Sequence, residues 1–349
     1  MNSPSPAVLV TGGAGYVGSE TVRVLIKNGF LPVVIDNLST GFRQAIPDVP
    51  FFEGDVRDID LLNLIFKAYQ ISAVIHLAAK IVVQESICDP IGYYDNNING
   101  LLNILQVCKK FSVKKFIFSS SATIYGNSNQ NLDSAEVGNR HELLSETSLI
   151  APISPYGTSK YFGEKILEDA KKDFGINSIC LRYFNVAGAS IDGLNGQRRL
   201  VATHIVHVAS CLALSKNNKI TIFGNDYQTL DGTCVRDYIH VEDIADIHVQ
   251  ALKHLGQNSE SHVLNCGYGI GYSVKQVVDT FNEVNNVDLK ILFGPRRLGD
   301  PTSLICNGTK LNKLFQWKPK HADLRVICKS AYLWQKKVSE SLMASNSER

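Results

Sequence analysis

Zinc-binding and disulfide motifs are missing from this sequence. None of the eight cysteines forms a C-x-x-C pair, and none of the nine histidines takes part in an H-x-x-x-H pair. These absences exclude the common zinc motifs. Scattered cysteines are typical of buried, reduced thiols in a cytoplasmic protein. We therefore expect no metal and a cytoplasmic location.

Long apolar runs and an excess of one charge are missing too. No apolar stretch reaches the roughly 20 residues that a membrane-spanning helix needs, and the N-terminus lacks the charged start and apolar core of a signal peptide. The formal net charge of +2 gives no basic surface for nucleic acid. We expect neither a membrane nor a nucleic acid as partner.

What the sequence does contain is a regular alternation of strand and helix patterns. Short apolar runs that read as buried strands are followed by segments with helical spacing. This order predicts an α/β protein with a doubly wound parallel sheet, the Rossmann arrangement. The expected strands are Ala7–Thr11, Leu31–Ile35, Ala73–Leu77, Lys115–Ser119 and Ile176–Tyr183, and the expected helices include Tyr16–Asn28, Ile59–Tyr69 and Tyr94–Lys110.

The alternation ends after Tyr183, which suggests a division of the chain. We expect residues 1–185 to form a dinucleotide-binding Rossmann domain, with a helical segment near 242–255 that returns to it. Residues 186–339 would mainly form a smaller C-terminal α/β region that caps the substrate. Residues 340–349 have the composition of a disordered tail.

A glycine-rich loop follows the first expected strand and opens the first helix. Gly12, Gly15 and Gly18 have the G-x-x-G-x-x-G spacing of a dinucleotide fingerprint, and Tyr16 and Val17 lie within it. Such glycines let backbone N–H groups approach a pyrophosphate at the helix N-terminus. The alternative is a glycine-rich turn without a ligand.

An acidic residue ends the second expected strand. There Asp36 would accept a hydrogen bond from a ribose 2′-hydroxyl and repel a 2′-phosphate, which favours NAD over NADP. Two further segments follow later strands. Asp55 and Val56 lie where an adenine contact is expected, although an ordinary turn aspartate is nearly as good a reading of Asp55. Ala78 and Ala79 leave room for backbone to meet the cofactor.

Tyr156 and Lys160 are one helical turn apart, so both project from one face of a helix. A lysine ammonium beside a phenol favours the phenolate, which would make Tyr156 a base for a sugar-type hydroxyl. Ser121 closes a strand upstream, where it would contact the same hydroxyl. The alternatives are a half-buried tyrosine covered by a surface lysine, and turn hydroxyls for the serines, which is the better reading for Ser119 and Ser120.

Together these motifs resemble the extended short-chain dehydrogenase/reductase superfamily and, within it, the UDP-glucose 4-epimerases. The resemblance runs from about residue 7 to about 335. The superfamily-level segments are 11–18, 36–41, 93–97, 119–126, 154–160 and 181–185, and those typical of the nucleotide-sugar half are Ile-Phe-Gly-Asn-Asp-Tyr at 222–227, Val-Arg-Asp-Tyr-Ile-His-Val at 235–241 and Pro-Arg-Arg-Leu-Gly-Asp-Pro at 295–301.

The resemblance implies roles for individual residues. Tyr156 would be the catalytic base, Lys160 its electrostatic and ribose-binding partner, and Ser121 the substrate contact. Asn37, Asn96 and Tyr183 fall in cofactor-contact positions. Positions that hold the UDP-sugar are Asn185, His204, Thr221, Phe223, Arg236, Val274, Arg297 and Asp300, with Leu304 beside the 2-substituent of the sugar.

Some of these positions have a simpler reading or depart from the family pattern. Arg236 and Arg297 also suit surface ion pairs with the neighbouring Asp237 and Asp300, and Phe223 and Val274 would pass as core. His204 lies in a segment that differs from the usual one. Lys80 stands one position out of register, so we assign it no role.

The reaction that the resemblance implies is reversible, NAD-dependent inversion at C4 of UDP-glucose or UDP-galactose through a 4-keto sugar. Related alternatives are a nucleotide-sugar 4,6-dehydratase, a decarboxylase, and an epimerase of UDP-N-acetylglucosamine or a UDP-pentose; a remote one is a non-catalytic NAD-binding sensor. A homodimer packed through helices near Tyr94–Lys110 and Pro155–Lys171 is also implied.

Overall fold

A seven-stranded parallel sheet forms the centre of the larger part of the molecule. The computed structural model describes residues 5–126, 143–198, 203–297 and 299–347, without the side chains of 342–347. The strand order is β10-β6-β5-β4-β1-β2-β3, and every neighbouring pair is parallel. The strands are β1 (Ala7–Thr11), β2 (Leu31–Asp36), β3 (Phe51–Glu53), β4 (Ala73–His76), β5 (Lys115–Ser121), β6 (Asn177–Tyr183) and β10 (His262–Cys266). The predicted α/β, doubly wound fold is confirmed.

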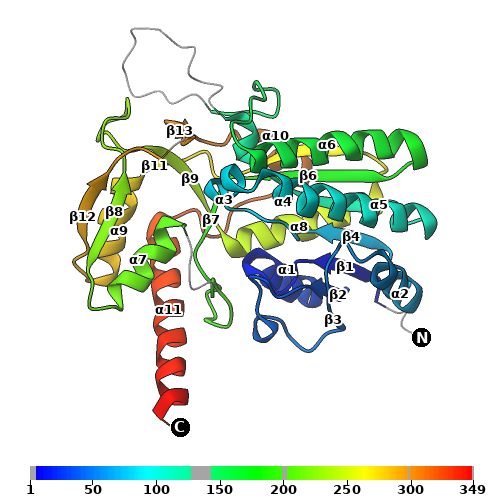
Figure 1. The fold of residues 1–349 in the computed structure, drawn as a ribbon, viewed down its shortest axis with the longest axis horizontal. Coiled ribbons are helices and arrows are strands. Elements are labelled where there is room, and N and C mark those ends of the chain that lie inside the picture. The colour runs from blue at the N-terminus through cyan, green and yellow to red at the C-terminus, as the bar shows by residue number, and fades with distance from the viewer. Residues whose placement is uncertain (1–4, 127–142, 199–202, 298, 348–349) are drawn as a thin grey trace.

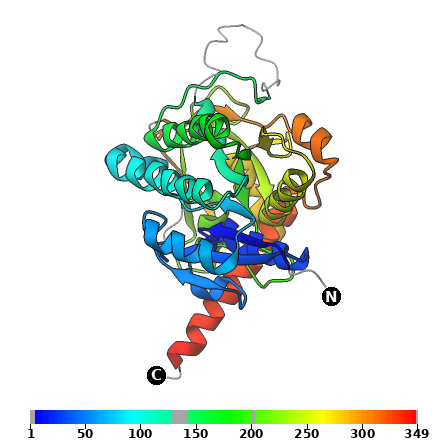
Figure 2. The same ribbon diagram turned by 90° about the vertical axis from the view of Figure 1, so that its right-hand side faces the viewer.

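Helices cover both faces of this sheet (Figures 1 and 2). Alternate residues of β1 enter opposite cores, with Val8 and Val10 on one face and Ala7 and Leu9 on the other. The first core also holds side chains of α1 (Tyr16–Lys27) and α8 (Val241–Gln257). The second holds those of α2 (Ile59–Tyr69), α5 (Gly100–Lys110) and α6 (Pro155–Phe174). Burial on both faces explains why the strands read as continuous apolar runs.

A smaller group of elements lies to the left of the large sheet in Figure 1. Strands β8 (Lys219–Phe223) and β12 (Lys290–Gly294) form one parallel pair, and β7 (Asn185–Ala187), β9 (Val235–His240), β11 (Gly271–Ser273) and β13 (Ser303–Leu304) form a second small sheet. Helices α7 (Ile205–Ala213), α9 (Val274–Asn285) and α11 (Leu324–Ser347) pack with them around a third core. The remaining helices are short: η1 (Arg43–Ala45), α3 (Val83–Cys88), α4 (Pro90–Tyr94), the π-helix η2 (Asp95–Asn99), η3 (Ala122–Tyr125) and α10 (Thr309–Phe315).

The large sheet does not end at residue 185, where the sequence suggested a division. One of its two edge strands is β10, which pairs with β6 from far along the chain. Helix α8 spans the segment near 242–255 that was expected to return to this domain. The short apolar run of β10 carries no periodicity that distinguishes it from its surroundings. The predicted tail also differs, because α11 continues to Ser347 and only residues 348–349 lie outside the described residues. No proline or glycine interrupts this segment.

Candidate active site

A cavity of about 830 Å³ lies at the carboxyl ends of the large sheet's strands and extends to the smaller region. This is the crevice where ligands bind in open α/β sheets. Every predicted site residue lines it: Gly12, Gly15, Tyr16, Val17, Gly18, Asp36, Asn37, Asp55, Val56, Ala78, Ala79, Asn96, Ser121, Tyr156, Lys160, Tyr183, Asn185, His204, Thr221, Phe223, Arg236, Val274, Arg297, Asp300 and Leu304.

The glycine-rich loop forms one end of the cavity. Gly12 has a positive φ of 68°, and a Cβ atom there would lie 2.7 Å from the backbone N of Ala78. A Cβ on Gly18 would lie 2.1 Å from the Gly12 carbonyl oxygen. Helix α1 begins here without a side-chain cap. Its first N–H groups are therefore available for a pyrophosphate, which fits a dinucleotide.

Carboxylates at the ends of β2 and β3 shape the next part of the cavity. Asp36 is buried and accepts hydrogen bonds from the backbone N–H groups of Ala14 at 3.0 Å and Leu38 at 2.8 Å. Asp55 is bound at 2.9 Å by the guanidinium of Arg57, which lowers the pKa of the Asp55 carboxyl to about 2. Asn37 also donates to Asp55, at 3.0 Å. Asp55 therefore fixes the loop that carries Asn37. This structural role agrees with the alternative interpretation of Asp55 as an ordinary turn aspartate.

The π-helix η2 connects the cofactor side to the catalytic helix through Asn97, a residue that sequence reasoning missed. Its amide group accepts from Lys80 N at 2.9 Å, and it donates to Lys80 O at 3.1 Å and to Ser159 Oγ at 3.0 Å. Asn96 donates to the same amide. The Lys80 side chain lines the cavity but pairs with Asp89 at 3.2 Å. A π-turn inside a helical stretch is often found at functional sites, and it has no sequence signature here.

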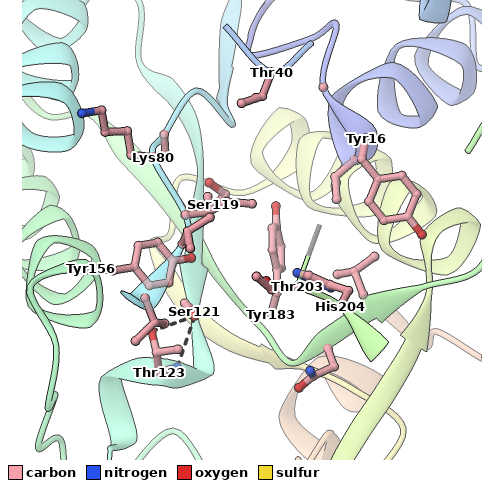
Figure 3. Close-up of a pocket in the computed structure, with 18 of the residues that line it drawn as sticks. Tyr16, Thr40, Lys80, Ser119, Ser121, Thr123, Tyr156, Tyr183, Thr203 and His204 are labelled. Atoms are coloured by element: carbon pink, nitrogen blue, oxygen red, sulfur yellow. Dashed lines mark hydrogen bonds between the residues drawn. The ribbon is translucent and has the colours of Figure 1, made fainter. Parts of the chain in front are cut away.

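The N-terminus of α6 brings Tyr156 into the cavity (Figure 3), and Lys160, one helical turn later, also lines it. Ser154 caps this helix by accepting from Gly157 N, and Pro155 is its first residue. Tyr156 and Lys160 are 9% and 3% exposed, so the reading as a surface lysine is wrong. Lys160 Nζ lies 6.0 Å from the centre of the Tyr156 ring and donates to Ser119 Oγ at 3.3 Å.

Hydroxyls at the end of β5 face this helix. Ser121 Oγ accepts from the backbone N of Thr123 at 3.2 Å and from Thr123 Oγ1 at 2.9 Å (Figure 3). Ser119 and Ser120 also line the cavity, and the Ser120 hydroxyl donates to Glu164 at 2.5 Å. Alternate residues of a strand point to the same side, so Ser119 could have been identified from Ser121. The interpretation of Ser119 and Ser120 as turn hydroxyls is wrong, because both lie within β5.

Burial controls the protonation of the central pair. It raises the pKa of the Tyr156 phenol, with the Ser121 hydroxyl acting in the opposite direction, and it lowers the pKa of Lys160 to about 7. The sequence predicted a phenol pKa lowered by lysine. The difference arises because both groups are buried, so each charged form loses hydration, and no carboxylate of the described residues offsets that loss.

Two arginines lie at the other end of the cavity, in the smaller region. Arg236 on β9 is buried, and its guanidinium lies 3.9 Å from the carboxylate of Asp300. Arg297 lies over the Phe223 ring, 4.1 Å from its centre. Asp237 is not an ion partner of Arg236; it accepts from the backbone of Tyr268 and Gly269. Arg236 thus keeps one long ion pair, with Asp300, but both arginines line the cavity, where they suit a diphosphate.

Among the described residues, one cluster of possible metal ligands is present, and it lies outside the cavity. The ligand atoms of His240, Glu242 and His321 all lie within 4.8 Å of one another, although the sequence separates them. His321 Nε2 lies 2.8 Å from the Glu242 carboxylate, and His240 Nδ1 accepts from the Glu242 backbone N–H. These contacts satisfy the cluster within the fold, as a helix cap and a close contact between His321 and the Glu242 carboxylate.

The fold and cavity are those of a dinucleotide-binding enzyme of the Rossmann type. A phosphate-binding loop lies at one end, a Tyr/Lys/Ser group in the middle and arginines at the other end. The chain belongs to the NAD dependent epimerase/dehydratase family, whose model matches residues 8–267. The prediction of NAD as cofactor is confirmed by this membership.

The resemblance to UDP-glucose 4-epimerases is also confirmed. The UDP-glucose 4-epimerase of Azospirillum brasilense is 43% identical over 98% of this chain and 95% of its own. The structure of the Bifidobacterium longum enzyme with NAD⁺ and UDP is similar with a TM-score of 0.86 and 35% identity, over 95% of this chain and 98% of that one. The UDP-Glc/GlcNAc 4-epimerase of Campylobacter jejuni has a TM-score of 0.80 and 43% identity, over 95% and 100%. Within the described residues, no helix combines the length and apolarity needed to cross a membrane.

Proposed function

We propose that this protein catalyses the reversible inversion at C4 of a UDP-hexose, converting UDP-glucose and UDP-galactose, with tightly bound NAD. The observation that carries the proposal is the single cavity that joins a dinucleotide loop, a buried Tyr/Lys pair and two arginines. This order matches a cofactor at one end, a nucleotide diphosphate at the other and a sugar between them. The similarity to enzymes named UDP-glucose 4-epimerase supports the same reaction.

Tyr156 acts as the base that takes the proton of the 4-hydroxyl and later returns it. Bound NAD supplies the hydride acceptor and donor at C4. Ser121, held by Thr123, orients the hydroxyl toward Tyr156. Lys160 is charged below a pKa of about 7, and an anionic partner in the cavity would extend that range. In its ammonium form it stabilises the phenolate that Tyr156 needs.

Inversion requires the sugar to present either face to one hydride donor. The UDP end of the substrate must therefore be held firmly, while the sugar end must be able to turn. Arg236 and Arg297 hold the diphosphate, with Asn185, His204 and Asp300 near it and with Thr221, Phe223 and Val274 around the uridine. The sugar end has fewer charged contacts and is free to turn. Leu304, 7% exposed on β13, forms an apolar wall there.

Two alternatives are weaker. A 4,6-dehydratase needs additional acid and base groups, and here Ser121-Ala122-Thr123 carries no carboxylate. A non-catalytic NAD sensor would have no use for the buried Tyr156 and Lys160.

A second substrate is favoured by one observation, the similarity to the Campylobacter jejuni enzyme named for both UDP-Glc and UDP-GlcNAc. Leu304 opposes it sterically, so we propose weak activity at best on N-acetylated sugars.

We also propose a cytoplasmic homodimer that acts in galactose metabolism. Large apolar side chains are exposed on neighbouring helices: Ile91 on α4 at 77%, Phe162 on α6 at 45% and Leu102 on α5 at 37%. Exposed apolar side chains grouped in this way suit a subunit interface. Light scattering during gel filtration, with Phe162→Glu as the disrupting variant, tests the dimer.

The function is tested by comparing UDP-galactose, UDP-N-acetylgalactosamine and a UDP-pentose as substrates of the purified protein. We expect UDP-glucose to form from UDP-galactose without added NAD, because the net redox change is zero. Failure to convert UDP-galactose by protein that retains NAD would contradict the proposal.

A further inference from the structure

A buried histidine lies directly behind one of the tyrosines that line the cavity. Tyr183, at the end of β6, faces the cavity, and its hydroxyl lies 2.5 Å from Nε2 of His248 on α8. His248 is fully buried and is not among the described residues that line the cavity. Tyr183 is the register partner of Ser121 on the neighbouring strand. It therefore stands beside the serine that orients the sugar hydroxyl in the proposed function.

The direction of the hydrogen bond between Tyr183 and His248 follows from the other ring nitrogen. His248 Nδ1 lies 2.8 Å from the carbonyl oxygen of Ile244, which only accepts, so Nδ1 carries a proton. Burial lowers the pKa of His248 to about 4, so the ring is neutral at working pH and has one proton. Nε2 is then an acceptor, and the Tyr183 hydroxyl must donate to it.

We propose that His248 is a positioning residue that holds the Tyr183 proton away from the cavity, so that Tyr156 is the one phenol of the pair that exchanges a proton with the substrate. This inference rests on the proposed function. With its proton directed at His248, the Tyr183 oxygen presents only lone pairs to the cavity. It therefore accepts hydrogen bonds there and cannot donate to a Tyr156 phenolate.

Loss of the acceptor should release this constraint. In His248→Leu the buried Tyr183 hydroxyl needs a new acceptor. Burial raises the pKa of Tyr183, and the charges of Cys266 and of the nearby Tyr156 raise it further, so the Tyr156 oxygen is a candidate for that acceptor. A hydrogen bond to the phenolate lowers the pKa of Tyr156, by about one unit for a bond to a charged group. The acidic limb of the pH profile, which reports the ionisation of this base, should therefore shift to lower pH.

The experiment measures the phenolate of Tyr156 by ultraviolet difference titration of NAD-containing protein without substrate, with each variant compared with its own Tyr156→Phe derivative. We expect the pKa of Tyr156 to be lowered in His248→Leu. In His248→Gln, which keeps an acceptor, it should stay near the wild-type value. In the double variant with His248→Leu and Tyr183→Phe, it should return to the wild-type value. His254→Leu, on the same helix and away from the cavity, is the control and should change nothing.

An unchanged Tyr156 pKa in His248→Leu, or a shift that persists when Tyr183 is Phe, would overturn the inference. A wild-type protein without epimerase activity would overturn the proposed function instead. The titration needs no turnover, so these two failures are separable.

Discussion

A buried ion pair beneath the active site gives a prediction with a calculable size. Glu164 and Arg182 have side chains that are 6% and 4% exposed, with Arg182 Nη2 and the Glu164 carboxylate 2.7 Å apart. Arg182 Nε and Ser120 Oγ donate to the other carboxylate oxygen, at 2.9 and 2.5 Å. Glu164→Gln removes the charge but keeps the volume, so Arg182 becomes a buried cation without a counter-ion. Breaking a buried pair in this way costs about 3–5 kcal/mol.

The measurement is the free energy of unfolding from urea denaturation of the NAD-containing protein. Asp173→Asn is the matched control, because Asp173 pairs with Lys109 at the same 2.7 Å while both side chains are more than half exposed. An exposed pair contributes only about 0–1 kcal/mol. Replacing both Glu164 and Arg182 by Met should cost less than Glu164→Gln alone, since no unpaired charge remains. A loss below about 1 kcal/mol in Glu164→Gln would refute the reasoning.

Four further outcomes are expected. Tyr156→Phe should keep the fold and bound NAD but lose about 10²–10⁴-fold in kcat, while Tyr161→Phe on the same helix keeps activity; more than about a tenth of the wild-type kcat in Tyr156→Phe would show that another group is the base. Asp36→Ala, with an arginine introduced beside it, should relax the preference for NAD toward NADP in a cofactor-exchange titration, and unchanged selectivity would remove Asp36 from the ribose site. Leu304→Cys should raise kcat/KM for UDP-N-acetylgalactosamine relative to UDP-galactose, within the roughly 1–3 kcal/mol that one misfitting group is worth; no response would show that Leu304 does not limit the pocket. Burial lowers the pKa of His76 from 6.5 to about 3, so the unfolded chain binds a proton in this range that the folded chain does not. Stability should therefore fall as pH drops below 6.5, and urea midpoints at pH 7.5 and 5 should differ less in His76→Gln.

The parts of the site that the sequence predicted are those with local motifs. Gly12, Gly15 and Gly18 are fixed by their spacing, and Tyr156 and Lys160 by the helical turn. All of them line the cavity. The fold class followed in the same way from buried strands that alternate with helices.

The rest depends on contacts between distant segments. Asn97 meets Ser159, and His248 meets Tyr183, across separations of 62 and 65 residues. No local pattern marks such partners. The protonation of Tyr156 was predicted in the wrong direction because a sequence shows that a lysine is near but not that both groups are buried.

The late arrival of β10 in the large sheet has a consequence for synthesis of the chain. β6 ends at residue 183 and its outer neighbour begins at residue 262, 79 residues later. At the ~5–20 residues per second of translation, β6 keeps an unpaired edge for ~4–16 s. A strand edge in that state can pair with another nascent chain. The cofactor-binding half is therefore not an autonomous module, and a fragment that stops before residue 262 should aggregate rather than bind NAD.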